Sequence, residues 1–128
     1  MEEKISPDEN LYRAVPMNPN FWKTNQQRPS SALFESNIGV SVDRDGKRDD
    51  KIITESFLER FGECNIKAVV FVNAGVCMDI GTYIKYLPKP DNEYHSEIHE
   101  SESVIEIKSS KAKKIASNCT VVYMNEAI

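Results

Sequence analysis

The chain has 128 residues, of which 40% are apolar and 28% charged, and its formal net charge is −4. This composition is typical of one soluble globular domain with a real core, and it argues against a disordered chain. The acidic balance also argues against unspecific DNA binding, although a locally basic pocket can still hold a small nucleotide.

The first ten residues of the chain are mostly polar. Residues 1–10 (MEEKISPDEN) lack the apolar core of a signal peptide and predict a flexible lead-in to a single domain over residues 11–128. Residues 11–15 predict a short strand, with Arg13 on the face opposite Tyr12. Prolines and asparagines then interrupt regular structure until a helical turn over residues 32–34, and residues 40–42 begin a second strand.

The middle and end of the chain alternate between short helices and strands. We expect helices over residues 54–62 and 111–117, and a helical turn that ends near residue 80. Strands are expected over residues 68–72, 82–87, 104–107 and 120–124, although the segment 82–87 also fits a helix. The pattern predicts an α+β fold: one domain with a mixed or antiparallel sheet of four to six strands and two or three short helices.

Apolar runs and cysteines indicate the compartment. The longest apolar run, residues 68–72 (AVVFV), is far too short to cross a membrane. The three cysteines, Cys64, Cys77 and Cys119, contain no C-x-x-C pair, and each lies beside an apolar stretch. We therefore expect reduced, buried cysteines in a cytoplasmic protein without membrane contact.

The most polar constellation lies between residues 28 and 44 (RPSSALFESNIGVSVDR). Its members share a capacity to bind or orient an anion: Arg28, Ser30, Ser31, Asp43 and Arg44, with Arg13 as a third arginine. Arginine presents a planar fork of donors that matches phosphate, and serine hydroxyls add further donors. Two interpretations stay open: an anion site in which Asp43 orients Arg28 or Arg44, and a structural network in which Asp43 pairs with an arginine and Ser30 caps a turn.

Both histidines lie in the acidic segment 91–106, and their spacing of four puts His95 and His99 on one face of a helix or of a strand. The segment HSEIHE differs from the H-E-x-x-H zinc motif and has no cysteine nearby, so we expect no metal and no cofactor. We place His95 in an exposed loop. There it is a candidate general acid or base if the loop reaches the arginines. Arg28 and Asp43 would complete the candidate catalytic set.

Three blocks of the sequence carry a resemblance. The segments R-P-S-S-x-x-F at 28–34, S-V-D at 41–43 and N-x-x-H-x-x-I at 92–98 resemble a group of small, functionally uncharacterised bacterial proteins. The resemblance spans roughly residues 11–124 and implies one domain with a shared set of polar residues. A weaker resemblance, to ADP-ribosyltransferases, would assign roles to Arg13, to Ser31 or Ser41, and to Glu106.

Two functional hypotheses follow. The first is binding, with or without processing, of a phosphate-bearing ligand such as a nucleotide or an RNA end; both a binding and a catalytic role fit these residues. The second is a non-catalytic interaction protein of the antitoxin, immunity or accessory type, whose acidic segment 91–106 docks a protein partner. The lysines near the C-terminus (Lys108, Lys111, Lys113 and Lys114) are interpreted as the solvated face of a helix.

Overall fold

A six-stranded antiparallel sheet organises the chain in the computed structural model, which describes residues 4–126. The spatial order is β6-β7-β4-β1-β5-β8, and every neighbouring pair is antiparallel. The strands are β1 (Asn10–Pro16), β4 (Val40–Arg44), β5 (Ile66–Asn73), β6 (Tyr83–Tyr86), β7 (His95–His99) and β8 (Thr120–Met124). A separate two-stranded ribbon pairs β2 (Trp22–Lys23) with β3 (Arg28–Pro29). The α+β prediction is confirmed.

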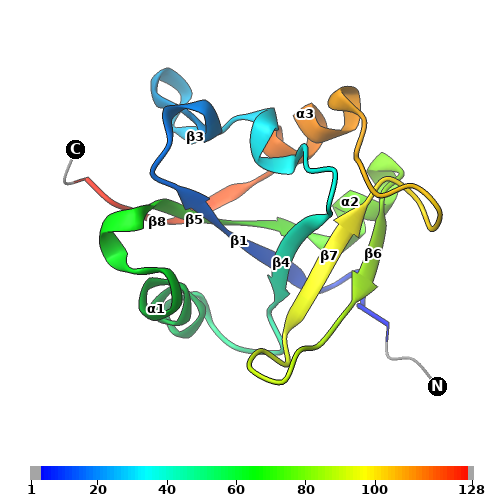
Figure 1. The fold of residues 1–128 in the computed structure, drawn as a ribbon, viewed down its shortest axis with the longest axis horizontal. Helices are drawn as coiled ribbons and strands as arrows, with labels where there is room; N and C mark the ends of the chain where they lie inside the picture. Colours follow the sequence, from blue (N-terminus) through cyan, green and yellow to red (C-terminus); the bar gives the residue numbers. More distant parts are fainter. Residues whose placement is uncertain (1–3, 127–128) are drawn as a thin grey trace.

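Three α-helices lie against the sheet, α1 (Asp50–Phe61), α2 (Ala74–Ile80) and α3 (Ser109–Ser117) (Figure 1). The predicted start of the first helix at Thr54 is wrong, because the Asp49 carboxylate accepts a hydrogen bond from the Ile52 amide and caps the helix earlier. Asn73 caps α2 in the same way, and Gly81 ends it with φ of 99°, a left-handed conformation that favours glycine.

The sheet buries side chains on both faces. Residues of α2, α3 and a short 3-10 helix over Ser31–Phe34 cover one face and share its larger core with Leu11, Val15 and Val70. On the opposite face, Ile53 and Phe57 of α1 pack on Tyr12, Ile66 and Val69. The central strand β5 is apolar along nearly its whole length because both of its faces are covered.

The lead-in predicted over residues 1–10 needs correction. Ile5 is buried in the larger core, and the Glu9 and Pro7 carbonyl oxygens accept hydrogen bonds from the first amides of α2. Residues 5–10 therefore belong to the folded domain, whereas residues 1–3 lie outside the described residues.

The acidic segment contains the largest difference from the sequence-based expectation. Residues 95–99 form β7, between β4 and β6, whereas the strand predicted over residues 104–107 is irregular chain. Ser96 and Ile98 of β7 are fully buried, and His95 is only 6% exposed. The placement of His95 in an exposed loop is therefore wrong, because two neighbouring strands enclose it.

The structure also tests what the sequence predicted about the cysteines and about membrane-spanning segments. All three cysteines are free; Cys77 is buried, and burial raises the pKa of its thiol to about 12. Cys64 is exposed, contrary to the expectation that all three are buried. Across residues 4–126, none of the helices combines the length and apolar character that crossing a membrane requires.

Candidate functional site

The candidate site begins where two central strands part. β1 and β4 are paired only at Leu11 with Arg44 and at Tyr12 with Asp43, and they have no paired residues beyond this point. The remaining residues of β4 pair with β7 alone (Figure 1). The split leaves room for the Arg13 side chain, whose Nη1 donates to the Ser41 carbonyl oxygen at 2.6 Å.

A hollow of about 360 Å³ opens beside this split, and we call it the β1–β4 hollow. Its polar lining consists of Arg13, Ser41, Asp43, Arg60, Lys89, Asp91, Asn92 and His95. Three basic side chains thus face two carboxylates there, before any proton on the histidine is counted. Three residues predicted from the sequence as site residues, Arg13, Asp43 and His95, meet in this hollow.

Arg13 carries an uncompensated charge. Its Nε donates to the Leu33 carbonyl oxygen at 3.1 Å and its Nη1 to the Ser41 carbonyl oxygen, while no carboxylate within residues 4–126 contacts it. Burial lowers the pKa of Arg13 to about 10, so the guanidinium is still charged near neutral pH. Arg13 is only partly buried, but its charge is paired with neutral carbonyl groups alone, and an anion bound beside it would neutralise that charge.

Asp43 is 2% exposed, and both of its carboxylate oxygens accept hydrogen bonds from side chains. Its Oδ2 accepts from Arg60 Nη2 at 2.8 Å, and its Oδ1 accepts from Asn92 Nδ2 at 2.9 Å. The carboxylate therefore fixes a side chain of α1 and a side chain of the β6–β7 loop at the rim of the hollow. We expected Asp43 to orient Arg28 or Arg44, and this expectation is wrong, since its arginine partner is Arg60.

A histidine–glutamate–histidine row lies along one face of β7. Glu97 Oε1 is 2.8 Å from His99 Nε2, and Glu97 Oε2 is 3.4 Å from His95 Nε2. Burial alone would raise the pKa of Glu97, but the hydrogen bonds with His99 and His95 outweigh it and lower the pKa. Glu97 thus stays ionised and orients the His95 ring, which lines the hollow.

Two aromatic rings form an apolar wall. Phe57 and Phe61 line the hollow, and their nearly parallel rings lie 6.0 Å apart between centroids. Phe57 is buried, whereas Phe61 is 46% exposed, and the Arg60 guanidinium lies 5.0 Å and 5.4 Å from the two ring centroids. An exposed ring next to cationic groups is a surface on which a flat ligand can stack.

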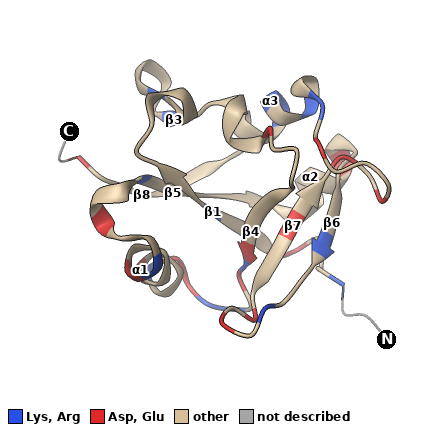
Figure 2. Ribbon diagram, viewed as in Figure 1, with Lys and Arg blue, Asp and Glu red and all other residues tan. Residues whose placement is uncertain are grey.

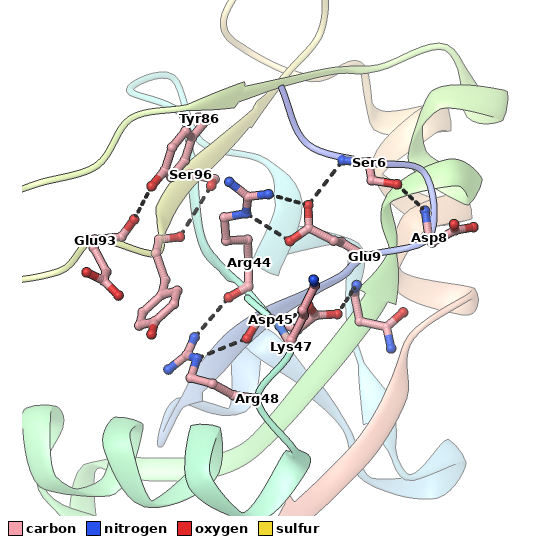
Figure 3. A network of polar contacts seen from close by, with 12 residues as sticks. Ser6, Asp8, Glu9, Arg44, Asp45, Lys47, Arg48, Tyr86, Glu93 and Ser96 are labelled. Carbon is pink, nitrogen blue, oxygen red and sulfur yellow. Dashed lines mark hydrogen bonds and ion pairs between the residues drawn. The ribbon is translucent and has the colours of Figure 1, made fainter. Parts of the chain in front are cut away.

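Arg44 belongs to a different network (Figure 3). Its Nε and Nη2 bind the two Glu9 carboxylate oxygens at 2.8 Å and 2.6 Å, and its guanidinium lies over the Tyr86 ring. The adjoining hollow, of about 880 Å³, is larger than the β1–β4 hollow, but four carboxylates outnumber three basic side chains in its lining. Arg44 therefore serves a bidentate ion pair and is not a ligand contact of the candidate site.

The segment around Arg28 is also separate from the β1–β4 hollow. Arg28 and Ser31 line another depression, between β3 and α3. Ser30 donates its hydroxyl proton to the Asn20 carbonyl oxygen at 2.5 Å and so braces the loop before β2. The single pocket predicted from the sequence is therefore divided among three places, and neither Arg28 nor Ser30 is a neighbour of His95 in the β1–β4 hollow.

The acidic segment 91–106 is used partly inside the fold. Glu97 contacts both histidines, and Glu100 is paired with Lys111 and accepts from the Lys108 amide. Glu106 is exposed on irregular chain, where the ADP-ribosyltransferase pattern requires a glutamate on a late strand. Of the two serines in that set, Ser41 lines the β1–β4 hollow with Arg13 and Ser31 lines another depression, whereas Glu106 lines neither.

Arg60 and Asn92, the two side chains that contact Asp43, were not predicted as site residues from the sequence. Arg60 lies in the last turn of α1, next to Phe61, and the pattern of that helix gave no sign of a partner on β4. Asn92 belongs to a turn in which its backbone exchanges hydrogen bonds with Lys89. A signal was present for Asn92, as the first residue of the N-x-x-H-x-x-I block, whereas nothing local singled out Arg60.

Comparison with known proteins adds no relative: no protein-family model, no curated protein and no solved structure matches the chain. Among residues 4–126, no group of three or more His, Cys, Asp or Glu side chains is arranged to hold a metal ion. The interpretation of the site therefore depends on its own geometry.

Proposed function

We propose that the chain binds a small phosphate-bearing ligand, a nucleotide or an RNA end, in the β1–β4 hollow. The observation that carries the proposal is the partly buried Arg13 guanidinium, which contacts two carbonyl oxygens and no carboxylate in the described part of the chain. Its Nη2 is the donor left for a ligand oxygen. Arg60, already held by Asp43, and Lys89 supply further positive charge at the rim.

A nucleotide fits the surroundings better than a bare anion does. A volume of about 360 Å³ lies at the lower end of the range of roughly 300–1,000 Å³ typical of small-molecule sites. The exposed Phe61 ring adjoins the cationic groups and offers a stacking surface for a base. The phosphate would lie at Arg13 and the base at the aromatic wall.

His95 extends the proposal from binding to phosphate-ester chemistry. Its Nε2 faces Glu97, while its Nδ1 has no hydrogen-bond partner among residues 4–126. Glu97 holds one ring nitrogen of His95, so Nδ1 is left to take a proton from the ligand or to give one to it. Arg13 and Arg60 would stabilise the negative charge that develops on the phosphate.

The test is ligand binding by two matched variants. Arg13→Met removes the charge but keeps a long side chain, and Arg48→Met is its control because Arg48 also donates to two backbone carbonyl oxygens, at 3.0 Å and 2.9 Å, outside this hollow. We expect Arg13→Met to lower the affinity for AMP by about tenfold or more, the effect of losing one charged contact. Arg48→Met should leave the affinity unchanged.

A third variant keeps the test informative if Arg13→Met does not fold. Phe61→Ala removes an exposed ring and should weaken AMP binding while leaving the weaker binding of orthophosphate unaltered. A wild-type chain that binds neither probe in calorimetry would overturn the proposal. It would favour the competing hypothesis of a non-catalytic partner protein, for which the exposed carboxylates of Asp91, Glu93, Glu102 and Glu106 are the remaining support.

A further inference from the structure

A second cationic surface lies away from the β1–β4 hollow, between the β2–β3 ribbon and α3. Lys23, Arg28, Lys113 and Lys114 surround a depression of about 270 Å³, and we call it the basic groove. No carboxylate is among its lining residues. Figure 2 shows basic residues on the ribbon and on α3, on a chain whose net charge is −4.

Like charges face each other across the ribbon. Lys23 of β2 is the direct partner of Arg28 of β3 in the antiparallel register. Like charges directly opposite each other destabilise a strand pair. None of the four basic side chains forms an ion pair with a carboxylate of residues 4–126, so the repulsion is not relieved within the described chain.

The Arg28 side chain makes one hydrogen bond within the described chain, through its Nε. Its Nε donates to Gln26 Oε1 at 2.6 Å, and the amide neutralises none of its charge. Both Nη atoms are left as the forked donor pair that matches phosphate oxygens. The Ser31 hydroxyl, which has no hydrogen-bond partner in the described chain, lies at the same groove and adds a donor.

We propose that the basic groove binds an oligophosphate group, meaning two or three linked phosphates. A single phosphate carries about two negative charges near neutral pH, whereas four converging cations match a di- or triphosphate. Lys113 and Lys114 of α3 line one side of the groove, and Lys23 and Arg28 of the β2–β3 ribbon line the other, so a chain of linked phosphates can bridge them. The same chemistry occurs in free tripolyphosphate and in the 5′-triphosphate of a nucleotide or an RNA.

The groove is distinct from the site of the proposed function. Arg28 and Ser31 line the groove, whereas Arg13 and His95 line the hollow, and the two linings share no residue. The two proposals therefore fail separately: variants of α3 test the groove, and variants at Arg13 or Phe61 test the hollow.

The experiment is calorimetric titration of the full chain with tripolyphosphate at about 50 mM salt, where exposed charges are weakly screened. The variant Lys113→Ala/Lys114→Ala should lower the affinity by about tenfold or more, as expected for the loss of two charged contacts. The control Lys4→Ala/Lys51→Ala removes the same charge from exposed positions elsewhere and should change the affinity by less than about twofold.

Two further arms identify the ligand. An RNA with a 5′-triphosphate should bind as tripolyphosphate does, and the same RNA with a 5′-hydroxyl should bind much more weakly. Equal binding of the two RNAs would show recognition of the nucleic-acid backbone and would overturn the proposal. Absence of tripolyphosphate binding, or equal losses in the α3 variant and its control, would overturn it as well.

Discussion

Asp43 and His95 are direct cross-strand partners in the β4–β7 register, although they lie 52 positions apart in the chain. The pairing brings the Asp43–Arg60–Asn92 cluster and the His95–Glu97–His99 row to one face of the sheet, where Asp43 and His95 line the same hollow. An anchored arginine and an oriented imidazole thus lie beside the unpaired charge of Arg13. Four predictions test this arrangement.

The first prediction concerns proton transfer. If His95 acts as general acid or base, His95→Gln should lower hydrolysis of nitrophenyl phosphate esters by about 100-fold or more. The matched control is His99→Gln, because His99 contacts the same Glu97 carboxylate but does not line the hollow. Steady-state rates at several pH values measure both variants. Equal losses in the two would indicate a structural role for the row and contradict catalysis by His95.

The second prediction concerns the stability of the Asp43 cluster. Asp43→Ala leaves Asn92 Nδ2 and Arg60 without their shared acceptor, and we expect a loss of about 1–3 kcal/mol in the free energy of unfolding. Arg60 is about one-third exposed and water replaces part of its pairing, which keeps the loss below that of a fully buried ion pair. Urea unfolding compares this variant with Asp91→Ala, an exposed carboxylate at the same hollow that should cost little.

The third prediction is a pH dependence that arises from Glu97. Its pKa in the folded chain lies below the ordinary value of 4.5, because the hydrogen bonds with His99 and His95 outweigh the effect of burial. A lowered folded-state pKa contributes stability that is complete above the unfolded-state pKa and is lost as pH falls through the folded-state value. The stability difference between wild type and Glu97→Gln should therefore be large near about pH 6 and shrink toward about pH 3.

Thermal unfolding across this pH range provides the measurement for Glu97. Glu102→Gln is the control, since Glu102 is exposed on the loop after β7. A difference between wild type and Glu97→Gln that stayed constant as the medium was acidified would contradict the assigned ion pairs.

The fourth prediction contrasts two arginines that the sequence placed in one set. Arg44→Met strands the Glu9 carboxylate, which is 13% exposed, and we expect a loss of about 2–4 kcal/mol in the free energy of unfolding. Arg28→Ala breaks one contact with a neutral amide and should stay within about 0.5 kcal/mol of wild type. Chemical denaturation of both variants measures the two losses in the free energy of unfolding. A larger loss for Arg28→Ala than for Arg44→Met would contradict the separate roles of the two arginines.

Local patterns were sufficient for much of the secondary structure. The apolar run of β5, the alternation of β6 and the β-branched residues of β8 predicted strands, since these patterns are properties of each segment itself. Asn118 at the end of α3 and Gly81 after α2 marked helix ends for the same reason. The segment HSEIH read as a loop, because histidine and glutamate are rarely enclosed and only its placement between β4 and β6 buries them.

Local sequence patterns alone predicted the α+β class, most of the helices and strands, and three residues that meet at the candidate site, Arg13, Asp43 and His95. The folded arrangement was needed to show that Arg44 is paired with Glu9, that Arg28 lies beside α3, and that Arg60 and Asn92 contact Asp43. The two kinds of feature differ in how far apart in the chain the interacting residues lie. Periodicity, capping and turn chemistry act over a few neighbouring residues, whereas charges meet through strand register and helix packing between segments far apart in the chain.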